Sequence, residues 1–320
     1  MKRRDFLAAL FFPCLAHRVA AAAKARIVIL HSGFADRTPI HQLYSALSDL
    51  GHHQGQTADI ELLSADGDPD RLTSFVAHIS QVQPQVIIAV TSPAALALKR
   101  AHVSKPVVFL FVSDPIRLGL VKSLPRPGAN YTGVTFSDAF LGAKRLQLLT
   151  DTVPEMRTVA VLWSPQFQEN AALVESILIA GKRFSIEVAT IEISGAAGLP
   201  AAFDGAVAAR AQAVIFITEN ALFNHRRTIA DLALARKLPT IHTFPPEVHD
   251  GGLMSFCPDL RESYHRAAAL TDRVLQGALP RDLPVEEPSR FTLCVNMRTA
   301  AALGLNVPDS ILALADEVID

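Results

Sequence analysis

Short apolar segments alternate with longer amphipathic ones along almost the whole chain, and this alternation constrains the fold more than any other feature. Residues 26–31, 86–90 and 107–112 are apolar at nearly every position, and each segment ends in small or polar residues. Strands of a parallel sheet have this composition, because helices cover both faces of the sheet. The segment 68–82 instead places apolar residues three or four positions apart, as a helix packed on such a sheet does. The sequence therefore predicts an α/β fold.

The pattern occurs twice. The first series has strands at 26–31, 60–63, 86–90 and 107–112, and the second at 159–163, 186–193, 214–218 and 240–243. Two successive series, each able to fill its own core, predict two doubly wound parallel-sheet lobes. The remainder after Gly251-Gly252 is too short for a third core, so it must pack back onto both lobes and form a hinge. We expect residues 24–137 and about 258–285 in an N-terminal lobe, and residues 138–257 and about 286–320 in a C-terminal lobe.

Residues 1–23 have the composition of an export signal. Arg3 and Arg4 precede an apolar run at 6–16 and an alanine-rich stretch at 19–23 that offers cleavage sites. Adjacent arginines followed by Phe-Leu favour the twin-arginine route, which exports folded proteins. A membrane span needs about 20 apolar residues, and this run is far shorter. We expect a soluble protein exported to the periplasm of a bacterium.

Charge and cysteine content exclude several classes of function. Removing residues 1–23 takes four basic residues from 30 and one acidic residue from 31, which leaves 26 and 30. That balance gives no electrostatic reason to expect nucleic acid as a partner. Cys257 and Cys294 lie in apolar, strand-like segments and are expected to be buried free thiols, although an oxidising compartment would permit a disulfide. With the histidines scattered, we expect no metal site, and without a phosphate-binding glycine motif we expect no cofactor.

Polar residues at the ends of the predicted strands are the candidates for ligand contact. Ligands of open α/β sheets bind beyond the carboxyl ends of the strands, and two facing lobes would bring these ends to one cleft. The candidates are Ser32, Thr91, Ser92, Ser113, Asp114, Trp163, Glu219 and Asn220. Their hydroxyls, carboxylates and amide suit a small polar ligand, and the indole offers an aromatic wall. For each candidate, a purely structural role carries the same weight as ligand contact. Asp114 could cap a helix, Trp163 could lie between the lobes, and Glu219 could open a helix.

Motifs of hydrolytic enzymes are missing from the sequence. It contains neither a G-x-S-x-G nucleophile elbow nor an H-E-x-x-H zinc motif. The sequence therefore favours a binding protein over an enzyme. Two alternatives stay open: an exported hydrolase or transferase using Asp114 or Glu219, and a ligand-sensing subunit for a membrane receptor.

Short motifs in order along the mature chain resemble those of the substrate-binding proteins of ABC transporters, the group that includes tryptophan/tyrosine-type binding proteins. The motifs are Gly67-Asp68-Pro69-Asp70-Arg71-Leu72, Asp114-Pro115 with Gly119-Leu120-Val121, Pro127-Gly128 with Asn130 and Thr132-Gly133-Val134, Lys144-Arg145-Leu146, Gly251-Gly252-Leu253-Met254-Ser255, Asp282-Leu283-Pro284-Val285-Glu286, Ala302-Leu303-Gly304-Leu305 and Ala315-Asp316-Glu317-Val318-Ile319. The resemblance implies a fold like that of type I periplasmic binding proteins, with a small polar or aromatic solute, such as an amino acid, between the lobes. It also implies no catalysis, and a monomer that works with an ABC permease and ATPase subunits.

The sequence departs from this family's pattern at three places. Phe256-Cys257-Pro258 stands where relatives often have Tyr-Gly-Pro, and Pro125 stands where they often have alanine. Glu219-Asn220 replaces the Asp-Asn of tryptophan-type relatives. A longer acid could still meet a ligand amino group, but the departure leaves the identity of the ligand open.

Overall fold

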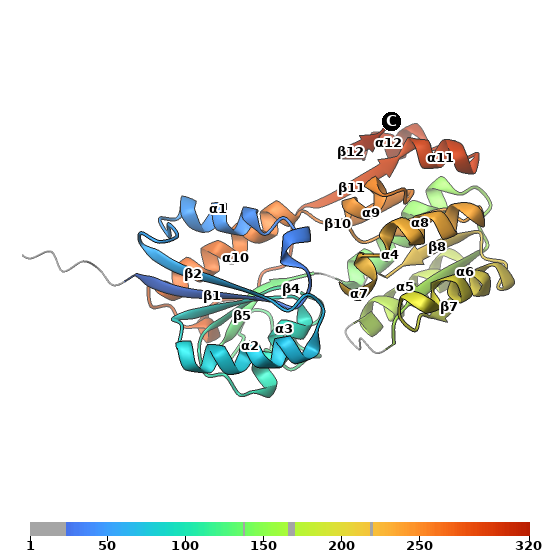
Figure 1. Cartoon of the computed structure of the whole chain (residues 1–320). Helices are drawn as coiled ribbons and strands as arrows, with labels where there is room; N and C mark the ends of the chain where they lie inside the picture. The colour runs from blue at the N-terminus through green and yellow to red at the C-terminus, as the bar shows by residue number, and fades with distance from the viewer. Residues whose placement is uncertain (1–23, 137, 166–169, 218–219) are drawn as a thin grey trace, which may run out of the picture.

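The computed structural model describes residues 24–136, 138–165, 170–217 and 220–320, which form two lobes side by side (Figure 1). The predicted export signal, residues 1–23, lies outside the described residues. Within the described ranges, no helix has the length and apolar character needed to cross a membrane. Cys257 and Cys294 are both buried and unbridged, which confirms the expectation of free thiols.

The first lobe is built on a five-stranded parallel sheet in the order β2-β1-β3-β4-β5. Its strands are β1 (Ala25–His31), β2 (Ala58–Ser64), β3 (Val86–Val90), β4 (Val107–Val112) and β5 (Tyr131–Thr135). Helices α1 (His41–Asp49) and α10 (Leu260–Leu275) cover one face, and α2 (Pro69–Val82) and α3 (Ser92–Arg100) cover the other. Each face has its own apolar core, as a doubly wound sheet requires.

The second lobe has a seven-stranded sheet in the order β12-β11-β10-β9-β8-β6-β7. Its strands are β6 (Thr158–Trp163), β7 (Glu187–Glu192), β8 (Ala213–Phe216), β9 (Thr240–His242), β10 (Met254–Pro258), β11 (Phe291–Asn296) and β12 (Glu317–Ile319). Its helices are α4 (Asp138–Thr152), α5 (Ala171–Phe184), α6 (Leu199–Ala208), α7 (Asn220–Phe223), α8 (Arg226–Ala235), α9 (Pro245–His249), α11 (Met297–Leu303) and α12 (Asp309–Leu312). Helices α4 and α5 pack on one face, and α6 and α8 on the other.

The prediction of two parallel-sheet α/β lobes is confirmed, with one exception in strand direction. β11 runs antiparallel to β10, whereas the other pairs of the second sheet are parallel. The chain leaves the second lobe after β10, adds α10 to the first lobe and then returns. β11 therefore enters the sheet from the side where β10 left it, and the two strands run in opposite directions.

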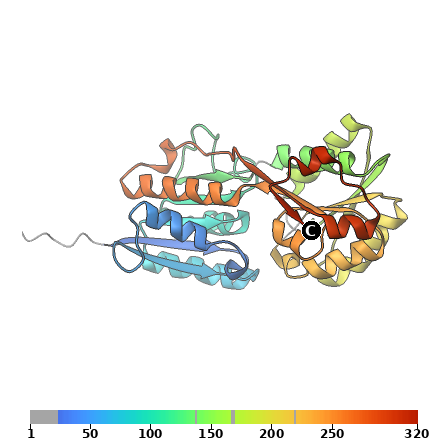
Figure 2. The same ribbon diagram turned by 90° about the horizontal axis from the view of Figure 1, so that it is seen from above.

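The described chain passes between the lobes three times: after β5, after β10 and before β11 (Figures 1 and 2). β5 and β10 both lead directly toward the other lobe. The strands parallel to them must end on the same side, so the carboxyl ends of both sheets face one another. In folds of this topology, ligands bind in the cleft between the carboxyl ends of the two sheets.

Charged hydrogen bonds join the two chain segments that connect the lobes after β10 and before β11. The guanidinium of Arg266, on α10, donates to the carboxylates of Glu262 at 2.8 Å and Glu286 at 2.9 Å. The other oxygen of Glu262 accepts from the backbone N–H of Arg290 at 2.9 Å, just before β11. The start of α10 and the return strand are therefore fixed to each other at the hinge.

Glu262→Gln is expected to lower the free energy of unfolding at neutral pH by about 1–2 kcal/mol, since hydrogen bonds to charged groups are worth this order. Partial burial alone would raise the pKa of Glu262, but hydrogen bonds from Ser289, Arg266 and the N–H of Arg290 lower it from 4.5 to about 2. The carboxylate's stabilisation is thus fully present above about pH 4.5 and is lost as the pH falls toward 2. In urea unfolding, the difference in free energy of unfolding between wild type and variant should be smaller at pH 3 than at pH 7. A difference independent of pH would contradict this assignment.

Candidate functional site

Two hydroxyls meet at the carboxyl ends of β1 and β3. Ser32 Oγ lies 2.5 Å from Thr91 Oγ1, and Ser32 is buried. Thr91 has a φ of +80°, which is rare for a β-branched residue and costs about 1–3 kcal/mol. The Thr91 N–H donates to the carbonyl of Leu110 at 2.8 Å, which holds this conformation in place. The structure therefore brings two of the sequence candidates together in a strained arrangement at the cleft edge.

The neighbouring His31 is a neutral group at this edge. Its burial lowers its pKa to about 4, and the backbone N–H of Gly33 donates to its Nδ1 at 3.0 Å. The imidazole thus acts as an acceptor that shapes the turn after β1, and at neutral pH it adds no positive charge beside Ser32.

The turn after β4 holds two more of the sequence candidates, Ser113 and Asp114, and a third, Ser92, begins α3 beside it. The buried Ser92 Oγ accepts from the N–H of Ser113 at 3.3 Å, which joins the ends of β3 and β4. Asp114 Oδ1 accepts from the N–H groups of Ile116 at 3.1 Å and Arg117 at 2.9 Å. This geometry is that of a turn closed by the carboxylate, and no helix lies in the described chain between β4 and β5, so the interpretation of Asp114 as a helix cap is wrong. Ser113 and Asp114 are both half-buried at the cleft edge.

The second lobe contributes Trp163, the last residue of β6. Its ring is half-buried and packs against the core under α4 and α5. The indole Nε1 is buried without a hydrogen-bond acceptor among the described residues, which is costly for a donor of this kind. Asn220 begins α7, and Glu219 lies outside the described residues.

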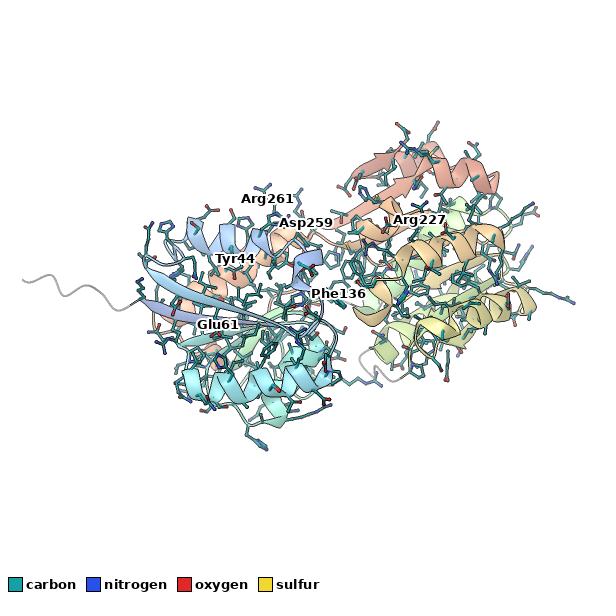
Figure 3. All side chains as sticks on the ribbon, in the orientation of Figure 1. Tyr44, Glu61, Phe136, Arg227, Asp259 and Arg261 are labelled. Atoms are coloured by element: carbon teal, nitrogen blue, oxygen red, sulfur yellow. The ribbon has the colours of Figure 1, made fainter. Side chains whose placement is uncertain are left out.

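A row of aromatic rings crosses the facing edges of the two lobes, and the sequence interpretation missed it. The aromatic row consists of Tyr264, Phe111, Phe136, Phe244 and Phe223 in spatial order. Successive ring centroids are 5.3, 6.0, 6.0 and 6.2 Å apart, and every pair meets edge to face. Phe136 lies between the lobes, directly after β5 (Figure 3). The signal was present in the sequence, because Phe111, Phe136 and Phe244 each stand at or just beyond the end of a strand.

Phe111 enters the aromatic row through a distortion of β4. Its φ is +57°, and the pairing of β4 with β5 shifts register between Leu110 and Val112. A bulge of this kind redirects a side chain, and backbone strain gathers at sites where geometry matters for function. The ring of Phe111 contacts Tyr264 of the first-lobe core and Phe136, the buried ring between the lobes.

Phe244 is held by a buried polar network behind it. Its N–H donates to Glu247 Oε2 at 2.8 Å, and Glu247 Oε1 lies 3.4 Å from His242 Nδ1. The other ring nitrogen of His242 is 2.8 Å from Thr240 Oγ1, and these polar side chains are almost fully buried. Such a network fixes the turn after β9 and with it the position of the ring.

An open hollow of about 410 Å³ adjoins the carboxyl ends of β1 and β2 on the first lobe. It is lined by Phe34, Ala35, Asp36, Ile40, Leu62, Ser64 and Asp66. The Ser64 hydroxyl donates to Asp66 at 2.6 Å, and this bond together with the Arg71 guanidinium lowers the pKa of Asp66 below its ordinary value. The Asp66 carboxylate is therefore ionised, but its charge is already paired with Arg71.

An ion pair joins the two lobes. Arg117, in the turn after β4, lies 3.7 Å from Glu175 on α5 through Nη1 and Oε2. Both side chains are exposed, so the pair contributes little to stability. Its position shows that the two lobes approach each other closely at this edge of the cleft.

The chain belongs to the ABC transporter substrate binding protein family, whose sequence pattern matches residues 27–319. A tyrosine-binding protein of Clostridioides difficile (strain R20291) is 26% identical over 260 residues, covering 81% of this chain and 74% of that protein. An ABC domain from Streptococcus pneumonia, solved in complex with L-Trp, has a TM-score of 0.85 at 23% identity and covers 93% of this chain and all of that one. A ligand-free, open substrate binding protein with adhesive properties from Clostridium difficile has a TM-score of 0.69 at 22% identity, covering 92% and 99%.

These findings confirm the resemblance drawn from the short motifs. The family comprises solute-binding proteins rather than enzymes, and they work with permease and ATPase components. The eight candidate residues from the sequence and the aromatic row remain proposals for this chain.

Proposed function

We propose that this protein is an exported receptor of an ABC importer that captures an aromatic amino acid between its lobes. The observation that carries the proposal is the aromatic row, which lies where the carboxyl ends of both sheets meet. Edge-to-face contact between a ligand ring and such side chains adds about 0.5–1.5 kcal/mol per pair beyond the burial of apolar area. The tyrosine-binding relative and the L-Trp complex of a structural neighbour support the same ligand class.

The polar candidates supply partners for the other end of an amino acid. The paired hydroxyls of Ser32 and Thr91 suit the ligand carboxylate, because a hydroxyl donates strongly to an ionised acceptor. The ligand ammonium group needs an anion, and Asp114 offers a carboxylate on the first lobe; Glu219, the other acidic candidate from the sequence, lies outside the described residues. Trp163 would give its unpartnered Nε1–H to a ligand oxygen.

A ligand held by both lobes favours their approach. The closed form is stabilised only to the extent that the ligand binds it more tightly than the open form. Contacts to Thr91 on one lobe and Phe244 on the other can be made at the same time only in the closed form, and this provides the difference. The Arg117–Glu175 pair joins the two lobes and adds a weak contact that favours the closed form.

L-Tryptophan, L-tyrosine or L-phenylalanine is expected to raise the melting temperature of the purified protein by roughly 5–10 °C. At ligand 100-fold above the dissociation constant, linkage supplies about 2.7 kcal/mol, and this corresponds to such a shift in a chain of this size. N-acetyl-L-tryptophan, which lacks the ammonium group, and L-leucine, which lacks the ring, are the matched controls and should give smaller shifts. Absence of any shift across the aromatic amino acids would count against the proposal.

A further inference from the structure

Helix α9 and strands β11 and β12 lie together on the second lobe (Figure 1), and each contributes one of three clustered side chains of different chemistry. His249 ends α9, Cys294 lies in β11 and Glu317 opens β12. One ligand atom from each residue lies within 4.8 Å of the other two, and His249 Nε2 is 2.9 Å from Glu317 Oε1. Imidazole nitrogen, cysteine sulfur and carboxylate oxygen are the donors that zinc takes in proteins. We propose that His249, Cys294 and Glu317 form a binding site for Zn²⁺.

The two sheet ligands are fixed by strand pairing. Cys294 and Glu317 are direct partners in the parallel pair β11–β12, so their side chains leave the same face of the sheet. The Asp316 carboxylate accepts from the N–H of Leu293 at 2.8 Å, and the Asp316 N–H donates to the carbonyl of Leu293 at 2.9 Å. The edge strand is therefore locked in register next to the thiol.

The histidine is fixed from both sides by the segment that carries the thiol. Asn296 Nδ2 donates to the carbonyl of Val248 at 2.9 Å, one residue before His249. Thr299 Oγ1 donates to the carbonyl of Gly251 at 3.0 Å, two residues after it. All three ligands thus come from backbone held by secondary structure, which favours a preorganised site.

The spacing suits one tetrahedral ion. Bonds of about 2.0–2.3 Å to nitrogen, oxygen and sulfur place ligand atoms roughly 3.3–3.7 Å apart. The ligand atoms are at most 4.8 Å apart, so side-chain rotations that move them by about one ångström bring them to this geometry. Three protein ligands leave a fourth position for water, which can enter because His249 and Glu317 are half exposed while the thiol is buried.

Ser255 supplies support behind the thiol. It lies directly opposite Cys294 in the antiparallel pair β10–β11, on the same face of the sheet. Its buried hydroxyl has no hydrogen-bond partner within the described part of the chain. A donor in this position suits a metal-bound thiolate, since outer hydrogen bonds orient and stabilise first ligands. The bound ion would join α9, β11 and β12 and hold the edge strand in place.

Zinc chloride alone, added to untagged, chelator-treated protein, tests the site by calorimetry. We expect one ion per chain with a micromolar or tighter dissociation constant, and a melting temperature raised by about 5 °C at 100-fold excess over that constant. Cys294→Ser, His249→Gln and Glu317→Gln should each weaken binding at least tenfold. The matched control is His78→Gln: His78 forms a similar exposed pair with Glu61 at 2.8 Å but belongs to no three-ligand cluster of the described residues. It should bind zinc like wild type.

Cobalt(II) gives an independent readout of the thiol. A thiolate bound to Co²⁺ produces a charge-transfer band in the near ultraviolet, which Cys294→Ser should abolish and Cys257→Ser should retain. The proposal is overturned if wild type binds no zinc, if Cys294→Ser binds it as tightly as wild type, or if His78→Gln loses it equally.

Discussion

Phe244→Ala is expected to weaken binding of an aromatic amino acid by roughly 30-fold or more, which corresponds to about 2 kcal/mol for a central aromatic contact. Phe244 joins Phe136, the ring between the lobes, at 6.0 Å to Phe223 of its own lobe at 6.2 Å, so its removal separates Phe223 from the rest of the aromatic row. The ring is only half-buried, so the folded state should survive. Calorimetric titration and thermal unfolding of the same preparation separate the two effects.

Phe75→Ala is the matched control for this variant. Phe75 is also half-buried, but it lies on α2 against the outer core of the first lobe, far in the fold from the aromatic row. We expect a similar loss of stability with unchanged affinity. Equal affinities of Phe244→Ala and wild type would remove the aromatic row from the binding site.

Trp163→Ala is expected to weaken binding by roughly tenfold, because about 1.4 kcal/mol of ring contact and hydrogen bonding is lost. Folding should persist if the ring forms a wall of the cleft. A ring that serves only as core would give the reverse result: unchanged affinity and a loss of about 3–5 kcal/mol in the free energy of unfolding. Trp163 is the only tryptophan of the chain, so its emission should also shift when L-tyrosine enters the cleft.

Much of the fold could be predicted from the period of apolar residues, but β5 could not. Its sequence, Tyr131–Thr135, contains Thr132 and Gly133 and lacks an apolar run, although all five residues are buried. Gly133 is needed because a Cβ there would lie 2.1 Å from the carbonyl oxygen of Phe109. Close approach of two strands is a tertiary property, and a glycine by itself gives no indication of it. The reversed direction of β11 likewise depends on the path of the chain through the first lobe.

The site could be predicted only in its polar part. The rule for strand ends selected Ser32 and Thr91, which the structure places in contact, and their role in ligand binding stays a prediction. The same rule passed over Phe111 and Phe244, because a phenylalanine beside an apolar strand has the composition of core. Only the bulge at Phe111 and the turn held by Glu247 direct these rings to the cleft.

The proposed zinc ligands could not be predicted from the spacing of residues along the sequence. His249, Cys294 and Glu317 come from three separate elements, and no short motif connects them. The expectation of no metal site rested on the absence of clustered histidines, a signal that cannot detect a site assembled by strand pairing. We therefore replace that expectation with the proposed zinc site.

Small-angle scattering of the empty and the saturated protein tests most directly whether a solute is captured between the two lobes. The solute is the aromatic amino acid that gives the largest rise in melting temperature. Because a ligand bridging both lobes favours the closed form, we expect the radius of gyration to fall on saturation. Phe244→Ala should need a correspondingly higher concentration for the same change. Identical scattering curves for empty and saturated wild type would contradict the account and place the ligand on a single lobe.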